Sequence, residues 1–299
     1  MSKYDITILT DCRYVAPKVL DEYIQNVLDE DRLLQEALEQ NKLTVHRINW
    51  DHPSFDWSST RYILFRTTWD YFERFGEFSA WLHEVSTKTK LINQKELIYW
   101  NIDKHYLKDL SEQGIRIPQT VFIESGDPYS LKEYIECCNW DEFILKPAIS
   151  GAARHTYRFK KEAYEQHSSI FKDLIKNEAL MLQEYQKQIT TKGEVAFMIF
   201  GGKFSHAVLK KAKPGDFRVQ DDFGGTLHDY EPCKEEIEFV EKVVSVCDPL
   251  PLYARVDVIW DNEDKLCLGE IELIEPELWF RRESGAAKMC ADAIMDYIC

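Results

Sequence analysis

Hydrophobic and polar positions in the first third of the chain follow two different periods. Residues 18–42 and 76–85 repeat apolar side chains at helical spacing. Short apolar runs of strand length lie around these helices, at 5–9, 44–48 and 62–65. Strands that alternate with helices favour a mainly parallel sheet, and such sheets bind ligands at the carboxyl ends of their strands. The stretch Arg66-Thr67-Thr68-Trp69-Asp70-Tyr71 follows the third run and is expected at such an end.

The middle third continues with helices and short strands. The spacing predicts helices at 104–113, 131–138 and 161–176. Strands are expected at 119–123, 143–146, 156–159 and 181–185. A loop of small residues, 150–153, joins two of these strands.

The last third has antiparallel signals. Two strands, 194–200 and 203–210, flank the dipeptide Gly201-Gly202, which is typical of a two-residue hairpin turn. A second hairpin is predicted from strands 253–260 and 265–274, and helices are predicted at 234–246 and 283–298. The whole pattern predicts a mixed α/β fold in two or three lobes.

Composition narrows the class of protein. The 299 residues include 44% hydrophobic and 13% aromatic side chains, which excludes global disorder. Asp and Glu number 52 against 37 Lys and Arg, so the formal net charge is −15. A chain this acidic is a poor general binder of nucleic-acid polymers, because phosphate affinity comes from Lys and Arg. An anionic ligand therefore requires locally concentrated cations or a bound metal.

The ends and the cysteines indicate a cytoplasmic protein. No cationic segment followed by an apolar one opens the chain, and no stretch approaches the roughly 20 apolar residues that span a bilayer. We therefore expect no signal peptide and no membrane contact. Eight cysteines without a CxxC or HExxH pattern are expected to be reduced thiols and not a zinc site.

Three carboxylates cluster on the second predicted hairpin. Glu270 and Glu272 are two residues apart, so both side chains face the same way. If the turn centres on residues 262 and 263, Asp257 faces position 268 and Glu270 is its diagonal neighbour. Like charges this close are costly unless a cation joins them, and Mg²⁺ suits oxygen ligands. The alternative is a solvent-facing charged surface on a one-sided sheet.

Several cations occupy distinctive places in the pattern. Lys146 ends an apolar strand directly before Pro147, and Lys210 ends the strand after the glycine turn. Arg218 follows eight residues later, Arg255 lies on the acidic hairpin, and Lys104 lies in the first turn of a helix. Taken singly, Lys146 is equally well explained as a snorkelling side chain, and Lys104 as an ordinary surface lysine.

In combination these features resemble the ATP-grasp superfamily, and most closely its glutathione-synthetase-like and cycloserine-forming ligases. The resemblance covers roughly residues 92–280. It implies that two lysines contact the nucleotide, a small-residue loop closes over its phosphates, and a hinge strand and a carboxylate hold adenine and ribose. The residues at these positions are Lys104, Lys146, Ser150, Gly151, Ala152, Gln183, Glu184, Tyr185 and Glu194. Alanines at 152 and 153 replace the usual glycines, which puts the mobility of this loop in question.

The resemblance also implies cofactors, ATP and two Mg²⁺ ions. The positions of the metal ligands match Asp257, Glu270 and Glu272, the last of which stands where Asn is usual. Lys210, in place of the usual Arg, and Arg218 match the cations on the phosphate and substrate side, and Arg255 is a further candidate for the substrate carboxylate. The expected lobes are an N-terminal substrate lobe at 1–92, a central domain with an ATP lid at 93–185 and a C-terminal domain with the Mg²⁺ site at 186–299.

The implied reaction joins a carboxylate to an amine through an acyl phosphate, either between two molecules or within one. In the N-terminal lobe, Arg66 is expected to bind a substrate carboxylate and Asp70 an ammonium group, with Trp69 beside them. Packing aromatic residues and a helix cap explain the same stretch nearly as well. The partner is then a small amino-acid-like molecule, and a homo-oligomer stays open. The alternatives are a ligase that acts on a peptide or protein terminus, a nucleotide-binding regulatory module without turnover, and an acidic interaction protein without a ligand.

Overall fold

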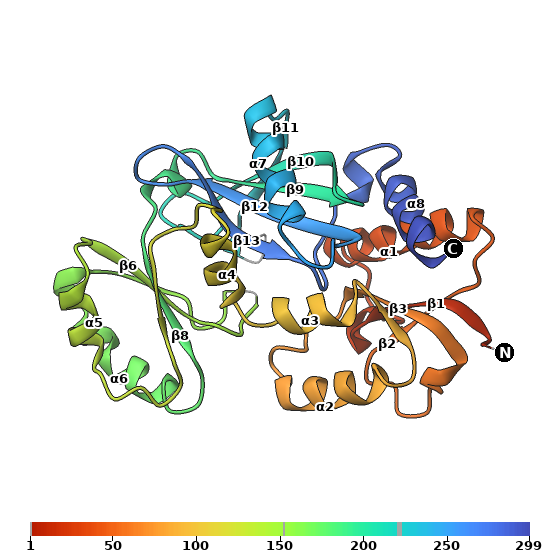
Figure 1. Cartoon of the computed structure of the whole chain (residues 1–299), viewed down its shortest axis with the longest axis horizontal. Coiled ribbons are helices and arrows are strands. Elements are labelled where there is room, and N and C mark those ends of the chain that lie inside the picture. The colour runs from red at the N-terminus through yellow and green to blue at the C-terminus, as the bar shows by residue number, and fades with distance from the viewer. Residues whose placement is uncertain (1, 152, 220–222) are drawn as a thin grey trace.

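The computed structural model describes residues 2–151, 153–219 and 223–299. Three sheets succeed one another along the chain (Figure 1). The first is wholly parallel, as predicted, and its strand order is β2 (Val45–Asn49), β1 (Tyr4–Thr10), β3 (Thr60–Thr67) and β4 (Lys90–Ile92).

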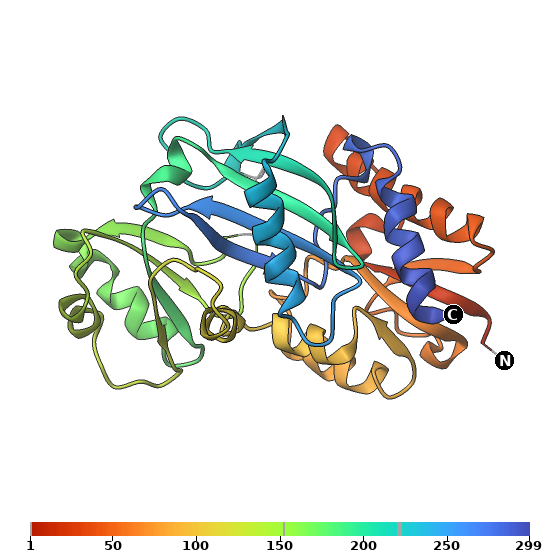
Figure 2. The same ribbon diagram turned by 45° about the horizontal axis from the view of Figure 1, so that its top comes forward.

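Helices cover both faces of the first sheet. Leu34 and Leu38 of α1 (Glu22–Gln40) pack with Ile6 and Ile8 of β1. Phe78 and the other buried residues of α2 (Phe75–Val85) pack on the opposite side chains of the strands. The C-terminal helix α8 (Ala286–Ile298) joins the α1 side, so the end of the chain lies beside its beginning (Figure 2).

The second sheet is antiparallel and lies at the far end of the molecule (Figure 1). Its order is β5 (Thr120–Ile123), β8 (Leu180–Glu184), β6 (Glu142–Pro147) and β7 (Tyr157–Lys160). The helices α5 (Leu131–Cys137) and α6 (Glu165–Leu174) pack against it. Ser130 caps α5 reciprocally with Glu133, which explains where this helix begins.

The third sheet is antiparallel and lies between the other two. Its order is β11 (Thr226–Tyr230), β10 (Lys203–Lys211), β9 (Glu194–Phe200), β12 (Tyr253–Trp260) and β13 (Leu266–Glu272). The predicted glycine hairpin is confirmed: Gly201 and Gly202 have φ values of 56° and 78° and join β9 to β10.

Alternation along β12 separates a core face from a polar face. Ala254, Val256 and Val258 pack with the buried residues of α7 (Lys234–Ser245). Arg255 and Asp257 therefore emerge on the other face, although this central strand is almost wholly buried. Two buried charges thus lie side by side, facing away from the apolar core.

Further short elements connect these layers. The helices α3 (Lys95–Asn101) and α4 (Tyr106–Glu112) lead from the first sheet to the second. One-turn 3₁₀ helices lie at Cys12–Tyr14, Trp57–Ser59, Lys161–Ala163, Lys187–Thr190 and Phe280–Arg282. Within the part of the chain that the structure describes, none of the helices is long and apolar enough to cross a membrane.

Asn93 joins the first sheet to the third. It follows β4, is fully buried, and donates through Nδ2 to the carbonyl oxygens of Tyr253 (2.8 Å) and Leu273 (2.9 Å). Its Oδ1 accepts from the backbone N–H of Leu252 at 2.6 Å. One side chain therefore satisfies backbone groups of two segments that are distant from it in the sequence.

We predict that Asn93→Ala lowers the free energy of unfolding by about 3 kcal/mol, because several buried backbone groups lose their hydrogen-bond partner. Chemical denaturation of the purified variant measures this. Asn177→Ala, at an exposed position, is the matched control and should change stability by no more than about 0.5 kcal/mol. Equal effects of the two substitutions would contradict the proposed bridging role.

Candidate active site

The acidic hairpin has a different register from the predicted one. Asp257 pairs directly with Glu270, and Arg255 pairs with Glu272. The sequence pattern predicted position 268 opposite Asp257, but a β-bulge at Gly269 inserts one residue into β13. A Cβ atom at Gly269 would lie 3.3 Å from the carbonyl oxygen of Asp257, so the bulge also favours a residue without a side chain. The observed register brings Asp257 and Glu270 closer together than the predicted diagonal arrangement.

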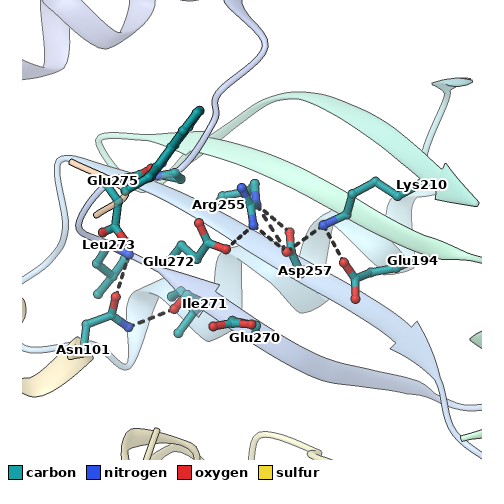
Figure 3. Close-up of polar contacts among 12 residues, drawn as sticks. Asn101, Glu194, Lys210, Arg255, Asp257, Glu270, Ile271, Glu272, Leu273 and Glu275 are labelled. Atoms are coloured by element: carbon teal, nitrogen blue, oxygen red, sulfur yellow. Dashed lines mark hydrogen bonds and ion pairs between the residues drawn. The ribbon is translucent and has the colours of Figure 1, made fainter. Parts of the chain in front are cut away.

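Asp257 and Glu272 each meet a cation (Figure 3). Asp257 is 3% exposed and accepts hydrogen bonds from Lys210 Nζ (2.8 Å) and Arg255 Nε (2.9 Å). Arg255 also pairs with Glu272, and Lys210 also pairs with Glu194. The five side chains form one continuous buried network on the polar face of the third sheet.

The network shifts the proton affinity of its members in both directions. Burial opposes the charged form of Asp257, but Arg255 and Lys210 outweigh it and lower the pKa of this carboxyl. Burial likewise opposes the charge of Lys210, yet Asp257 and Glu194 raise its pKa. Burial, reinforced by the charges of Glu270 and Asp257, raises the pKa of Glu272 to about 7. The ion pairs of Asp257 are therefore the firmly charged centre of the site.

A separate contact fixes the Glu270 carboxylate. Lys104 Nζ lies 3.0 Å from Glu270 Oε1 and donates to the carbonyl oxygen of Ser150 at 2.6 Å. Lys104 and Lys146 hold the pKa of Glu270 below its usual value, against the effect of burial. Lys104 thus links the acidic hairpin to the small-residue loop.

The predicted metal ligands are paired with cations in this structure. Among the residues described, no group of three or more His, Cys, Asp or Glu side chains is arranged to hold a metal ion. Mg²⁺ is usually held by one or two carboxylates together with substrate phosphates, and Asp257, Glu270 and Glu272 supply oxygen donors of the right kind. The residue types fit such an ion, and the three-carboxylate assignment stays a prediction.

A cavity of about 250 Å³ opens over this network. Lys104, Lys146 and Lys210 line it. Lys146 has no ion-pair partner in the described part of the chain, and burial lowers its pKa. Apolar residues line the same cavity: Ile144, Ile189, Phe217, Val219 and Ile259. Apolar walls beside clustered cations suit a purine base attached to phosphates. The residues therefore fit a nucleotide.

The predicted hinge residues border this cavity, as does Glu194. The backbone N–H groups of Glu184 and Tyr185 already donate to neighbouring strands, to the carbonyl oxygens of Gln119 and Glu142. The side chain of Gln183 donates to Thr120 Oγ1 at 3.0 Å. Arg218 also lines the cavity, and a bidentate pair with Asp216 fixes its guanidinium, with a closest distance of 2.8 Å.

The small-residue loop lies against the N-terminal lobe. Ser150 and Gly151 line the nucleotide cavity, whereas Ala152 lies outside the described residues. A Cβ atom on Gly151 would come within 2.7 Å of the Phe72 ring. Glycine is therefore required here by close approach.

A second cavity, of about 410 Å³, adjoins the first. The two share part of their walls: Lys104, Ser150, Gly151, Lys210, Arg255, Glu270 and Glu272. The N-terminal lobe and the segment after β13 supply most of the remaining wall, and Asn101, Ile102, Leu227 and Ile271 supply the rest. A small molecule in the second cavity would therefore meet a nucleotide in the first across the charged network.

Of the three residues predicted to bind substrate, only one lines a cavity described here. Trp69 lines the second cavity. Arg66 lines neither cavity; it is 1% exposed and donates to the carbonyl oxygen of Pro276 at 2.9 Å. Asp70 also lies outside both linings and accepts from Trp50 Nε1 (2.7 Å) and Arg74 (3.0 Å). The structure thus gives Arg66 and Asp70 structural partners where substrate contacts were predicted.

Residues missed by the sequence reasoning complete the second cavity. They include Arg13, Phe72, Glu275, Glu277 and Trp279, and Tyr71 of the predicted specificity stretch lines the cavity beside them. Burial, together with the charge of Glu272, raises the pKa of Glu275 to about 8. The carboxylates at 270, 272 and 275 were visible in the sequence, but alternation in a strand gives no direction for a residue beyond its end.

Comparisons with known proteins agree with this geometry. Residues 6–93 match the family model of the N-terminal domain of D-cycloserine synthetase DcsG. The cycloserine biosynthesis protein DcsG of Streptomyces lavendulae is 28% identical over 281 residues, which cover 88% of this chain and 92% of that protein. The crystal structure of D-cycloserine synthetase DcsG superposes with a TM-score of 0.85 at 24% identity and covers 98% of this chain and 99% of that one.

The fold extends to more distant ligases. The ATP-grasp ligase PsnB, solved with a variant of its minimal precursor, Mg and ADP, gives a TM-score of 0.61 at 13% identity, with 99% of each chain covered. The chain therefore has the ATP-grasp fold, and the predicted resemblance to its cycloserine-forming branch is confirmed. The prediction of an ATP-grasp ligase that forms C–N bonds is confirmed with it.

Gly151→Ala is predicted to destabilise the protein by about 1–3 kcal/mol, because the new methyl group overlaps the Phe72 ring. Adding Phe72→Leu should recover part of the loss, which a double-mutant cycle of unfolding free energies measures. Gly76→Ala, which meets no atom within 4 Å, is the control and should be neutral or slightly stabilising. Strict additivity of the two substitutions would show that the contact carries no energy.

The raised pKa of Glu275 gives stability a pH dependence. Between its ordinary pKa of 4.5 and about 8, the folded protein binds more protons than the unfolded chain. Stability is therefore expected to fall as pH rises through this range, and Glu275→Gln should make the fall shallower. Thermal unfolding at pH 5.5 and pH 8 tests this, with the exposed Glu231→Gln as a control that keeps the wild-type slope. An unchanged slope in Glu275→Gln would be the contrary result.

Proposed function

We propose that this ATP-grasp ligase uses ATP and Mg²⁺ to join the carboxyl group of a small amino-acid-like substrate to a nitrogen nucleophile. The observation that carries the proposal is the shared wall of the two cavities. Cations and carboxylates of the third sheet face both spaces at once. A carboxylate in one cavity and a phosphate chain in the other would meet at this wall.

ATP bound with Mg²⁺ would supply a γ-phosphoryl group to the substrate carboxylate with release of ADP, and the nitrogen nucleophile would then displace phosphate from the acyl phosphate. The chain contributes positioning and charge neutralisation, which are the main demands of phosphoryl transfer. Lys146, without an ion-pair partner among the described residues, is free to pair with a phosphate. Lys104, in the turn between α3 and α4, and Lys210 of β10 add positive charge at the same cavity.

The carboxylates would hold the metal by exchanging partners. Glu270 is the most open of the three, with a side chain 34% exposed, and it lies beside Lys104. Asp257 is the most enclosed and the most firmly charged, because Arg255 and Lys210 lower its pKa. The burial that raises the pKa of Glu272 favours its protonated form when no cation is added, and a bound Mg²⁺ would reverse that preference.

Arg255 is the residue best placed to orient the substrate carboxylate. It lines both cavities. Asp257 and Glu272 take its Nε and Nη2 donors, so Nη1 is the atom left to donate to a substrate carboxylate. Its Nε and Nη2 atoms are fixed by Asp257, so the group is held in one orientation. Arg218 lines only the nucleotide cavity and is expected to act on the phosphate side.

The second cavity favours a small substrate. Its volume of about 410 Å³ lies in the range of pockets that enclose small molecules. The similar proteins differ in the size of their substrates: one is a cycloserine biosynthesis protein, and the ATP-grasp ligase PsnB was solved with a precursor peptide. We assign this chain to the first kind of substrate because the cavity is bounded by the lobe that matches the cycloserine synthetase family.

We expect wild-type protein with Mg-ATP to release ADP only when a suitable carboxylic acid is added. Lys146→Ala and Glu270→Gln should each lower this rate at least about 100-fold, because each removes a charge needed in the transition state. An enzyme-coupled assay of ADP measures it, and the exposed Lys172→Ala should keep the wild-type rate.

Two outcomes would count against the proposal. Full ADP release by Lys146→Ala and Glu270→Gln would contradict the site assignment. Nucleotide binding without any ADP release, across a broad panel of carboxylic acids, would instead support a regulatory nucleotide-binding module.

A further inference from the structure

The hairpin of β12 and β13 lines the nucleotide cavity with two kinds of side chain. Asp257 and Glu270 belong to the charged network, whereas Ile259, farther along β12, is one of the apolar residues of the wall. The turn beyond Ile259, residues 261–265, extends toward the second sheet (Figure 2). One hairpin therefore contributes to both the charged and the apolar part of the cavity.

The segment that follows β8 forms another part of the same wall. Tyr185, Gln186 and Ile189 line the cavity, and Gln186 is only 6% exposed. The backbone N–H group of Gln186 donates to no acceptor within the described part of the chain. A nucleotide base has an apolar face and acceptor nitrogens at its edge, so an apolar side chain beside an unused backbone donor suits it.

Asn262, in the turn of the hairpin, holds this segment with three hydrogen bonds. Its Nδ2 donates to the carbonyl oxygen of Tyr185, and its Oδ1 accepts from the backbone N–H of Lys187, each at 3.0 Å. Its own backbone N–H donates to Gln186 Oε1 at 2.8 Å. Gln186 in turn donates through Nε2 to the carbonyl oxygen of Glu184 at 2.9 Å. The Asn262 side chain therefore fixes the backbone on both sides of Gln186.

Core packing does not account for these contacts. Asn262 is exposed and does not line the cavity, so it adds little buried area and touches no ligand there. Its partners nevertheless lie in a cavity-lining segment about 76 residues away in the chain. The folded state as a whole depends little on such a side chain, because exposed hydrogen bonds exchange readily with water. The position of the Gln186 N–H group depends on it directly.

We propose that Asn262 is a positioning residue for the nucleotide base. It fastens residues 185–187 to the hairpin and so sets the place of the Gln186 N–H group and of Ile189 relative to Ile259. The same hairpin carries Asp257 and Glu270, so Asn262 keeps the base end of the site in register with the phosphate end. The proposal rests on the proposed function, which assigns a nucleotide to this cavity.

The test compares a nucleotide with its phosphate chain alone. Isothermal titration calorimetry gives the Kd of Mg-ADP, and competition with Mg-ADP gives the Kd of Mg-pyrophosphate, for the wild type and for Asn262→Ala. The substitution removes two hydrogen bonds that hold the base end, so the Kd of Mg-ADP should rise about 10-fold. The Kd of Mg-pyrophosphate should stay within about twofold, because Lys104, Lys146 and Lys210 are unchanged.

A matched variant separates positioning from folding. Glu263→Ala removes another exposed side chain of the same turn, whose carboxylate pairs with Lys265 at 2.6 Å. It should leave both dissociation constants within about twofold of the wild-type values. The melting temperature of each variant without nucleotide should lie within about 4 °C of that of the wild type.

The outcomes distinguish this proposal from the ligase function itself. A Kd of Mg-ADP for Asn262→Ala equal to that for Glu263→Ala overturns the positioning role. So does an equal fractional loss of pyrophosphate affinity, which indicates a general loosening of the site, or a melting temperature lowered well beyond the stated range. Each of these results leaves the ligase function intact, whereas failure of the wild type to bind Mg-ADP overturns the proposed nucleotide site as well.

Discussion

The pairing of Asp257 with Arg255 and Lys210 is the interaction on which the rest of the site depends. A charged group that leaves water must find opposite charge, and these three residues are each at most 9% exposed. Alternation along β12 fixes two of them on one face, and the glycine hairpin brings the third beside them on β10. Because the opposite face packs on α7, the network cannot turn away from the cavities. Its charges are therefore available where two ligands would meet.

Contacts between distant parts of the chain build the second cavity. Asn93 and Asn101 bind backbone groups at the end of β13, and the hydroxyl group of Tyr253 donates to the carbonyl oxygen of Ile274 at 2.6 Å. Arg66 and Trp69 bind the next two residues. The N-terminal lobe therefore contributes in two ways: it lines part of the cavity, and it holds a segment of the C-terminal part in place. The match of residues 6–93 to the cycloserine synthetase family is consistent with this role.

Periodicity predicted most helices and strands, because amphipathic spacing determines which face is buried. It missed β4, which has only three residues, and β11, whose side chains are mostly polar because it lies at the sheet edge. The cations and carboxylates of the nucleotide cavity were predicted, since their order along the chain is informative. The bulge at Gly269, the burial of Arg66 and the direction of Glu275 were not, because each depends on tertiary contacts between separate strands and lobes.

The wall shared by the two cavities couples their occupants. Arg255 and Lys210 line both cavities, and the Asp257 carboxylate compensates the positive charge of both. Whatever binds first changes the electrostatic potential that the second ligand meets. By thermodynamic linkage the effect is reciprocal: if substrate strengthens nucleotide binding by some factor, nucleotide strengthens substrate binding by the same factor. The affinity of either ligand is thus a property of the pair, and values measured for one alone describe a different electrostatic state of the protein.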